Sequence, residues 1–162
     1  MPSDCYKITP PRRPDSFSVT VPGSKSITNR ALLLAALSDG ACTLKNALFS
    51  SDSKALITAL QELGISCTAD ETLKEINIVG CNGSLPNQSA TVNAMSAGTA
   101  ARFLTALLAF SDGIYTLDAS EQMKKRPMAP LIDALRSLGI SITPLGEEGH
   151  LPLRIEGGQK KL

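Results

Sequence analysis

The sequence predicts an α/β fold made of a duplicated unit. Short β-type segments alternate with aliphatic helical segments, an order that requires crossover connections between strands. The tripeptide Ser38-Asp39-Gly40 recurs 73 positions later as Ser111-Asp112-Gly113, and Leu63-Gly64-Ile65-Ser66 recurs 75 positions later as Leu138-Gly139-Ile140-Ser141. In the second pair the glycine follows a helical segment, where glycine commonly ends helices. This self-similarity indicates two copies of one unit.

Residues 16–84 are expected to form the first unit, in the order strand, helix, strand, helix, strand, strand. Strands are predicted near 17–21, 42–45, 65–69 and 75–79, and helices near 26–37 and 53–63. The second helix is amphipathic, because one of its faces carries Leu56, Ala59, Leu60 and Leu63. Residues 1–15 contain four prolines and are expected to be an irregular lead-in.

Residues 85–157 are expected to repeat this order as a second unit, followed by a short tail at 158–162. Strands are predicted near 90–93, 114–117, 140–143 and 152–156, and helices near 98–110 and 128–138. Polar turns join the final two strands of each unit, at Asp70-Glu71 and at residues 146–149. The two units together suggest a pseudo-symmetric packing.

Composition narrows the possible functions. The 162 residues are 43% hydrophobic and only 4% aromatic, so the core must be aliphatic. Sixteen basic residues balance fifteen acidic ones, which argues against a nucleic-acid or membrane-surface partner. No apolar run approaches a membrane span, and the N-terminus lacks a secretion signal, so we expect a cytoplasmic protein. The four cysteines lack metal-ligand spacing, so no metal site is expected.

The chemistry is expected where the first strand turns into the first helix, at Pro22-Gly23-Ser24-Lys25-Ser26 and Arg30. Ser24 is a good N-cap, and the free N–H groups of a helix start attract anions. Lys25 adds a charge and Ser26 a hydroxyl, while Arg30 lies four residues after Ser26 on the same helical face. Arginine suits two-pronged recognition of phosphate or carboxylate. A capped surface helix with ordinary solvated charges is the alternative.

Two further segments carry similar features. Ser96-Ala97-Gly98-Thr99 precedes Arg102 at a second helix start, where Gly98 permits a close backbone approach and Thr99 offers a hydroxyl. Gly98 could instead serve only tight helix packing. Lys124-Lys125-Arg126-Pro127 precedes a third helix, and Arg126 is the better candidate ligand contact because Pro127 fixes the backbone beside it.

These three segments together resemble one family, 5-enolpyruvylshikimate-3-phosphate synthase, also called 3-phosphoshikimate 1-carboxyvinyltransferase. The first signature is similar to residues 22–30, the second to 97–102 and the third to 123–127, with their order and spacing preserved. The similarity covers about residues 17–157. Ser96 stands where the family often has Asn, and Ala119 where Gly is usual.

The resemblance implies a two-domain enzyme with an inside-out α/β barrel fold, each domain holding three βαβαββ units. This chain matches the first two units of one domain and is expected to be a fragment. The family transfers the enolpyruvyl group of phosphoenolpyruvate to the 5-hydroxyl of shikimate 3-phosphate, through a tetrahedral intermediate that loses phosphate. No metal or organic cofactor is implied. The missing second domain would be a required partner, and the full-length enzyme is expected to be a monomer.

The resemblance also implies roles for individual residues. Lys25 would contact phosphoenolpyruvate, and Ser26 and Arg30 would hold shikimate 3-phosphate. Gly98, with Thr99 and Arg102 beside it, would bind the phosphoenolpyruvate phosphate, and Arg126 would be a further contact. Lys25 is also expected to be catalytic, together with Asp52, which resembles an acidic family position near the lysine. Asp52 could equally be the N-cap of the helix that starts near Ser53.

Acid and base groups come largely from the opposing domain in this family, so the chain alone is expected to be inactive. Two other functions compete with this interpretation. UDP-N-acetylglucosamine 1-carboxyvinyltransferase is similar in fold and chemistry. It typically has Lys-Asn where this chain has Lys25-Ser26, and a cysteine in the loop that corresponds to residues 119–126, where this chain has none. A non-catalytic anion-binding module is the alternative from another class.

Overall fold

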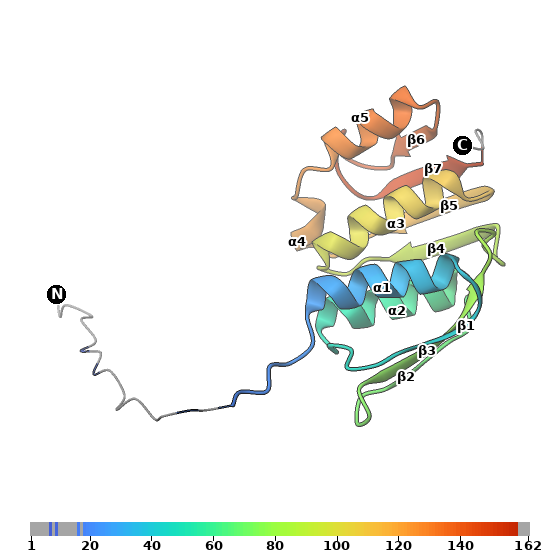
Figure 1. Cartoon of the computed structure of the whole chain (residues 1–162). Coiled ribbons are helices and arrows are strands. Elements are labelled where there is room, and N and C mark those ends of the chain that lie inside the picture. The colour runs from blue at the N-terminus through green and yellow to red at the C-terminus, as the bar shows by residue number, and fades with distance from the viewer. Residues whose placement is uncertain (1–6, 8, 10–15, 17, 159–162) are drawn as a thin grey trace.

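Two β-sheets and a layer of helices make up the structure, a computed structural model that describes residues 7, 9, 16 and 18–158 (Figure 1). The first half contains helices α1 and α2 and a sheet of three strands in the order β1-β3-β2. The bounds are α1 Lys25–Leu37, β1 Asp39–Leu44, α2 Ser51–Glu62, β2 Cys67–Asp70 and β3 Glu75–Cys81.

The second half contains three helices and a sheet of four strands in the order β4-β5-β7-β6. The bounds are β4 Ser89–Asn93, α3 Gly98–Phe110, β5 Gly113–Asp118, α4 Glu121–Lys124, α5 Ala129–Ser137, β6 Ser141–Pro144 and β7 Leu153–Gly157. Strands β4 and β5 are parallel and are joined through α3, while β5, β7 and β6 pair antiparallel. This is the mixed α/β architecture that the sequence predicts.

The three antiparallel strands of each sheet share their connectivity and their register. Strand β1 pairs with β3 so that Gly40 lies opposite Gly80, and β5 pairs with β7 so that Gly113 lies opposite Gly157. Positions 73 residues apart in β1 and β5 therefore occupy the same places. The order β1-β3-β2 corresponds to β5-β7-β6, as two copies of one unit require.

Gly80 and Gly157 show why glycine stands at matching places in the two halves. A Cβ atom on Gly80 would collide with the carbonyl oxygen of Ser38, and one on Gly157 with that of Ser111. These serines end α1 and α3, and their hydroxyls donate to carbonyls of the last helical turn, at 2.8 and 2.7 Å. The strands can lie against the helix ends only because no side chain intervenes.

The core is aliphatic and lies between the helices and the two sheets. Helix α2 contacts both α1 and α3, and α1 and α3 pack against β3 and β7. Side chains with no exposed surface include Leu32, Leu56, Leu60, Leu104 and Leu108. Each fully buried leucine contributes about 1.5–3 kcal/mol relative to an exposed one. The charged helix starts can therefore stay at the surface without carrying the fold.

Helices α1, α2, α3 and α5 all begin at the same end of the layer, where α4 also lies (Figure 1). Ser24 caps α1, its hydroxyl accepting from the Ile27 N–H at 3.4 Å. Ser50 caps α2 in a reciprocal capping box with Ser53, whose hydroxyl accepts from the Ser50 N–H at 2.8 Å. One end of the molecule thus gathers several helix N-termini.

The prediction of a strand at 17–21 is wrong for the part of it that the structure describes. Residues 18–21 belong to no strand, and Val19 and Val21 are 68% and 71% exposed. Strand pairing needs a neighbour, and this segment leaves α1 in a direction away from β1 (Figure 1). The first half thus lacks a counterpart of β4 among the described residues.

Smaller differences concern element ends. The four-residue helix α4 was not expected, because its turn is too short to show a helical period. Helix α2 begins at Ser51 rather than near Ser53, since Ser50 rather than Asp52 is the N-cap. Within the described ranges, no helix combines the length and apolarity needed to cross a membrane.

Candidate functional site

The first turn of α1 lies against the loop that leads into α2. A Cβ atom on Gly23 would collide with the carbonyl oxygen of Asn46, so only glycine allows this approach. The buried hydroxyl of Thr28 accepts from the Leu48 N–H at 3.1 Å, which ties α1 to the same loop. The loop leads directly to Ser50, the N-cap of α2. These contacts fix the two helix starts beside each other.

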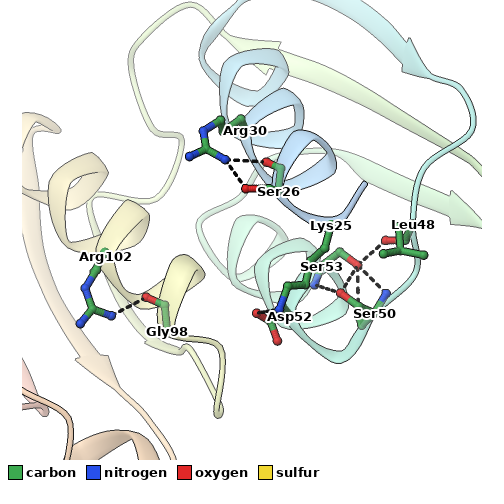
Figure 2. A network of polar contacts seen from close by, with 9 residues as sticks. All are labelled: Lys25, Ser26, Arg30, Leu48, Ser50, Asp52, Ser53, Gly98 and Arg102. Carbon is green, nitrogen blue, oxygen red and sulfur yellow. Dashed lines mark hydrogen bonds and ion pairs between the residues drawn. The ribbon is translucent and has the colours of Figure 1, made fainter. Parts of the chain in front are cut away.

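Lys25 reaches across this junction to Asp52. Its ammonium lies 3.2 Å from the carboxylate, and the Asp52 side chain is only 19% exposed while that of Lys25 is 51% exposed (Figure 2). The partly buried carboxylate holds a half-exposed amine at the helix start. The structure thus gives Asp52 the position beside Lys25 and not the N-cap position.

Arg30 folds back over the first turn of α1. Its guanidinium donates to the carbonyl of Ser26 at 3.0 Å and also contacts the Ser26 hydroxyl (Figure 2). On its other side the guanidinium lies 5.7 Å from the ring centroid of Phe103 in α3, a cation–π distance. Arg30 therefore connects the starts of α1 and α3, and its charge remains at the exposed end.

Gly98 brings two further guanidinium groups together at the start of α3. Arg102 donates to the carbonyl of Gly98 at 2.9 Å and to that of Pro127 at 3.2 Å. A Cβ atom on Gly98 would lie 3.2 Å from an Arg126 nitrogen and 3.3 Å from an Arg102 nitrogen. The N-cap of α3 is Ala97, whose side chain cannot accept a hydrogen bond from the first turn.

The remaining predicted residue of this group is Thr99, which is half-buried in the first turn of α3. Nearby, Lys124 pairs with Glu121 at 3.0 Å and Asp118 at 3.2 Å, and hydrogen bonds to these two carboxylates raise the pKa of Lys124. The positive charge of Lys124 is thus compensated by these two carboxylates. This leaves Arg126 as the basic side chain of the third segment that faces Gly98.

Unequal pairing is the main electrostatic feature of this end of the molecule. Within the described part of the chain, no carboxylate forms an ion pair with Arg30, Arg102 or Arg126, whereas Lys25 is paired with Asp52. Three guanidiniums and the positive ends of α1 and α3 therefore meet few compensating charges. Such an arrangement favours an anion with several oxygen acceptors.

Comparisons with known proteins identify the family to which the chain belongs. The family model described as EPSP synthase (3-phosphoshikimate 1-carboxyvinyltransferase) matches residues 12–162. The chain belongs to the EPSP synthase family. A relative named 3-phosphoshikimate 1-carboxyvinyltransferase from Trichormus variabilis is 45% identical over 156 residues, and one of the same name from Opitutus terrae is 47% identical over 155.

Solved structures agree with this membership. The chain resembles EPSP synthase from Acinetobacter baumannii with a TM-score of 0.82 and 28% identity, over 88% of this chain and 32% of that one. The enolpyruvyl transferase NikO from Streptomyces tendae matches with a TM-score of 0.52 and 15% identity, over 80% of this chain and 29% of that one, which shows the shared fold alone.

The chain spans only part of its EPSP synthase relatives. The match with the Trichormus variabilis protein covers 96% of this chain and 37% of that protein, and the match with the Opitutus terrae protein covers 94% and 36%. Most of the length of these relatives thus has no counterpart in the 162 residues.

Sequence reasoning missed two residues at this end of the EPSP synthase fold. Phe103 lies against the Arg30 guanidinium, and the only signal was an aromatic residue in a largely aliphatic helix. Asn29 has no exposed surface, and its amide has no hydrogen-bond partner within the described residues. A polar residue beside Arg30 in an aliphatic helix was the available signal for Asn29.

Proposed function

We propose that this chain is the N-terminal part of a 3-phosphoshikimate 1-carboxyvinyltransferase. The reaction transfers the enolpyruvyl group of phosphoenolpyruvate to the 5-hydroxyl of shikimate 3-phosphate and releases phosphate, as a step of aromatic amino acid biosynthesis. The observation that carries the proposal is a group of three guanidiniums that pair with no carboxylate among the described residues, together with Lys25, where α1 and α3 begin.

Both substrates suit this arrangement. Each is a phosphorylated carboxylate, so each presents several anionic oxygens to guanidinium and backbone N–H donors. In the proposed arrangement Ser26 and Arg30 hold shikimate 3-phosphate. Lys25 and Arg126 contact phosphoenolpyruvate, and the Gly98 N–H donates to its phosphate, with Thr99 and Arg102 at the same helix start.

The proposed chemistry needs charge to be held in place. The 5-oxygen of shikimate 3-phosphate bonds to C2 of phosphoenolpyruvate, the 5-hydroxyl proton is lost and C3 gains a proton, giving a tetrahedral ketal-like centre. The C2–O bond to phosphate then breaks and C3 loses a proton, which restores the double bond. Fixed cations stabilise the phosphate and carboxylate charges throughout, and Asp52 keeps the Lys25 ammonium in position.

The organisation proposed for the chain follows the repeat. Residues 1–15 precede the first unit at 16–84, the second unit occupies 85–157 and a tail occupies 158–162. The lead-in up to residue 15 and the tail from residue 159 lie almost entirely outside the described residues. A second domain supplies the other half of the active site, and the complete enzyme is a cytoplasmic monomer.

A chimera tests the function. This chain would replace the matching N-terminal part of the Trichormus variabilis relative, and phosphate release would be measured with phosphoenolpyruvate and shikimate 3-phosphate. We expect turnover from the chimera, none from the 162-residue chain alone, and a loss of about 100-fold or more in the Lys25→Ala chimera. Lys125→Ala is the matched control, because Lys125 is an exposed lysine outside the proposed contacts.

Two results would contradict the proposal. Turnover with UDP-N-acetylglucosamine in place of shikimate 3-phosphate would assign the other carboxyvinyltransferase activity. An inactive chimera whose 162-residue part still binds phosphate would favour a non-catalytic anion-binding module.

A further inference from the structure

The guanidinium of Arg30 is tied to its own helix through one nitrogen. Nη1 donates to the carbonyl of Ser26 at 3.0 Å and contacts the Ser26 hydroxyl (Figure 2). Nε and Nη2 donate to no group among the residues that the structure describes. These two nitrogens form one edge of the planar group, and such an edge can make a two-pronged contact with a carboxylate or a phosphate.

The ring of Phe103 supports the flat face of the same guanidinium. The central carbon of the Arg30 guanidinium lies over the ring, 5.7 Å from its centroid. The negative face of an aromatic ring attracts a cation placed within about 6 Å. Phe103 belongs to α3, so the contact is made by a second helix. Ser26 thus fixes one nitrogen of Arg30, and Phe103 restrains the plane of the whole group.

Packing alone does not require an aromatic side chain at this position. Phe103 is half-buried and lines an apolar groove together with Leu33 and Leu37 of α1. An aliphatic side chain of similar size can make the same apolar contacts. A leucine has no π face, however, and cannot attract the guanidinium. The contact with Arg30 is therefore what distinguishes phenylalanine from leucine here.

Holding Arg30 in advance favours binding of an anion. Arg30 is exposed, and a long exposed side chain loses rotamer freedom when it is ordered by a ligand. Contacts that order the side chain before the ligand arrives reduce this entropic cost. The ring of Phe103 supplies one such contact without using any of the hydrogen-bond donors of Arg30.

We propose that Phe103 is a positioning residue for Arg30, whose ring keeps the Nε–Nη2 edge of the guanidinium directed at the substrate. That the substrate is shikimate 3-phosphate rests on the function proposed above. Arg30 holds this substrate before and during the reaction, so Phe103 should act on KM and not on kcat.

Replacement of the ring in the chimera tests this, with the dissociation constant of shikimate 3-phosphate measured by calorimetry. Phe103→Leu should bind about three- to fivefold more weakly, with KM raised by the same factor and kcat unchanged. Phe103→Tyr keeps the ring and should bind as the unmodified chimera does. Phe110→Leu is the matched control, because Phe110 lines the same groove and makes no cation–π contact within the described residues.

A double-mutant cycle shows whether Phe103 acts through Arg30. Phe103→Leu should cause no further loss of binding when Arg30 is already alanine. The same loss in both backgrounds would overturn the proposal, and so would equal losses in Phe103→Leu and Phe103→Tyr. Unchanged binding by Arg30→Ala would contradict the proposed function as well. A loss in Arg30→Ala with none in Phe103→Leu would overturn this inference alone.

Discussion

The ammonium of Lys25 lies 3.2 Å from the carboxylate of Asp52, which joins the first residue of α1 to the second residue of α2. The pair sets the direction of the amine at the end of the molecule where the helices begin. Because the Lys25 side chain is half-exposed, the ion pair contributes little to the stability of the fold. Its main effect is to hold the Lys25 ammonium in position.

Asp52→Asn should therefore separate position from stability. We expect the free energy of unfolding to change by less than about 1 kcal/mol. In the chimera, kcat/KM for phosphoenolpyruvate should fall about tenfold, which corresponds to about 1.4 kcal/mol of transition-state stabilisation. Glu71→Gln is the control, since it breaks the exposed Lys54–Glu71 pair, 2.6 Å long, and should leave kcat/KM unchanged. An equal loss in both variants would mean that the position of Lys25 is irrelevant.

Gly98→Ala should disturb binding without disturbing the fold. The added Cβ atom would lie 3.2–3.3 Å from the ends of the Arg126 and Arg102 side chains, which are flexible and can shift. Unfolding free energy should change by no more than about 0.5 kcal/mol, because the new methyl group meets no backbone. Affinity for phosphoenolpyruvate, measured by calorimetry in the chimera, should drop about tenfold. Unchanged affinity would show that the two guanidiniums do not contact the ligand.

Gly80→Ala and Gly157→Ala should each destabilise the chain. Both would drive a Cβ atom into a backbone carbonyl at a helix end, and overpacking of this kind typically costs about 1–3 kcal/mol. Gly146→Ala is the matched control, because its nearest neighbour lies at an ordinary 3.6 Å. Urea denaturation would measure all three variants. A stable Gly157→Ala beside an unstable Gly80→Ala would show that the two halves are packed differently.

Stability should fall as pH rises above 9. Burial raises the pKa of the Cys67 thiol above its ordinary value of 9.0. Between these two values the unfolded chain has lost the thiol proton and the native chain has kept it, so rising pH favours unfolding, by at most about 1.4 kcal/mol per pH unit. Cys67→Ala should flatten the profile above pH 9. A decline in Cys67→Ala as steep as in the unmodified chain would assign the effect to another group.

The fold could be predicted where periodicity and repetition agree. Helix α3 was predicted at its observed bounds, because a long aliphatic run between Gly98 and Ser111 favours a helix. The segment at 17–21 has a strand-like sequence, but its residues 18–21 pair with no strand among the described residues. Pairing depends on which parts of the chain lie side by side, and a local pattern does not show that.

The sequence predicted the residue types of the candidate site better than it predicted which side chains contact one another. Glycine, lysine and arginine at helix starts indicated anion binding, and the structure brings Gly98, Arg102 and Arg126 together. The pairing of Asp52 with Lys25 could not be separated from an N-cap by sequence, since both interpretations suit an aspartate in a first turn. The contact of Arg30 with Phe103 joins residues more than 70 positions apart, and the sequence does not show that these two side chains meet.

The central claim is that the clustered helix starts bind a phosphorylated substrate, and Arg30 tests it most directly. The dissociation constant of shikimate 3-phosphate would be measured by calorimetry for the chain, for Arg30→Ala and for the exposed control Lys125→Ala. We predict at least about tenfold weaker binding for Arg30→Ala, the loss of one charge-assisted contact, and no change for the control. Binding by Arg30→Ala as tight as that of the unmodified chain would contradict the account.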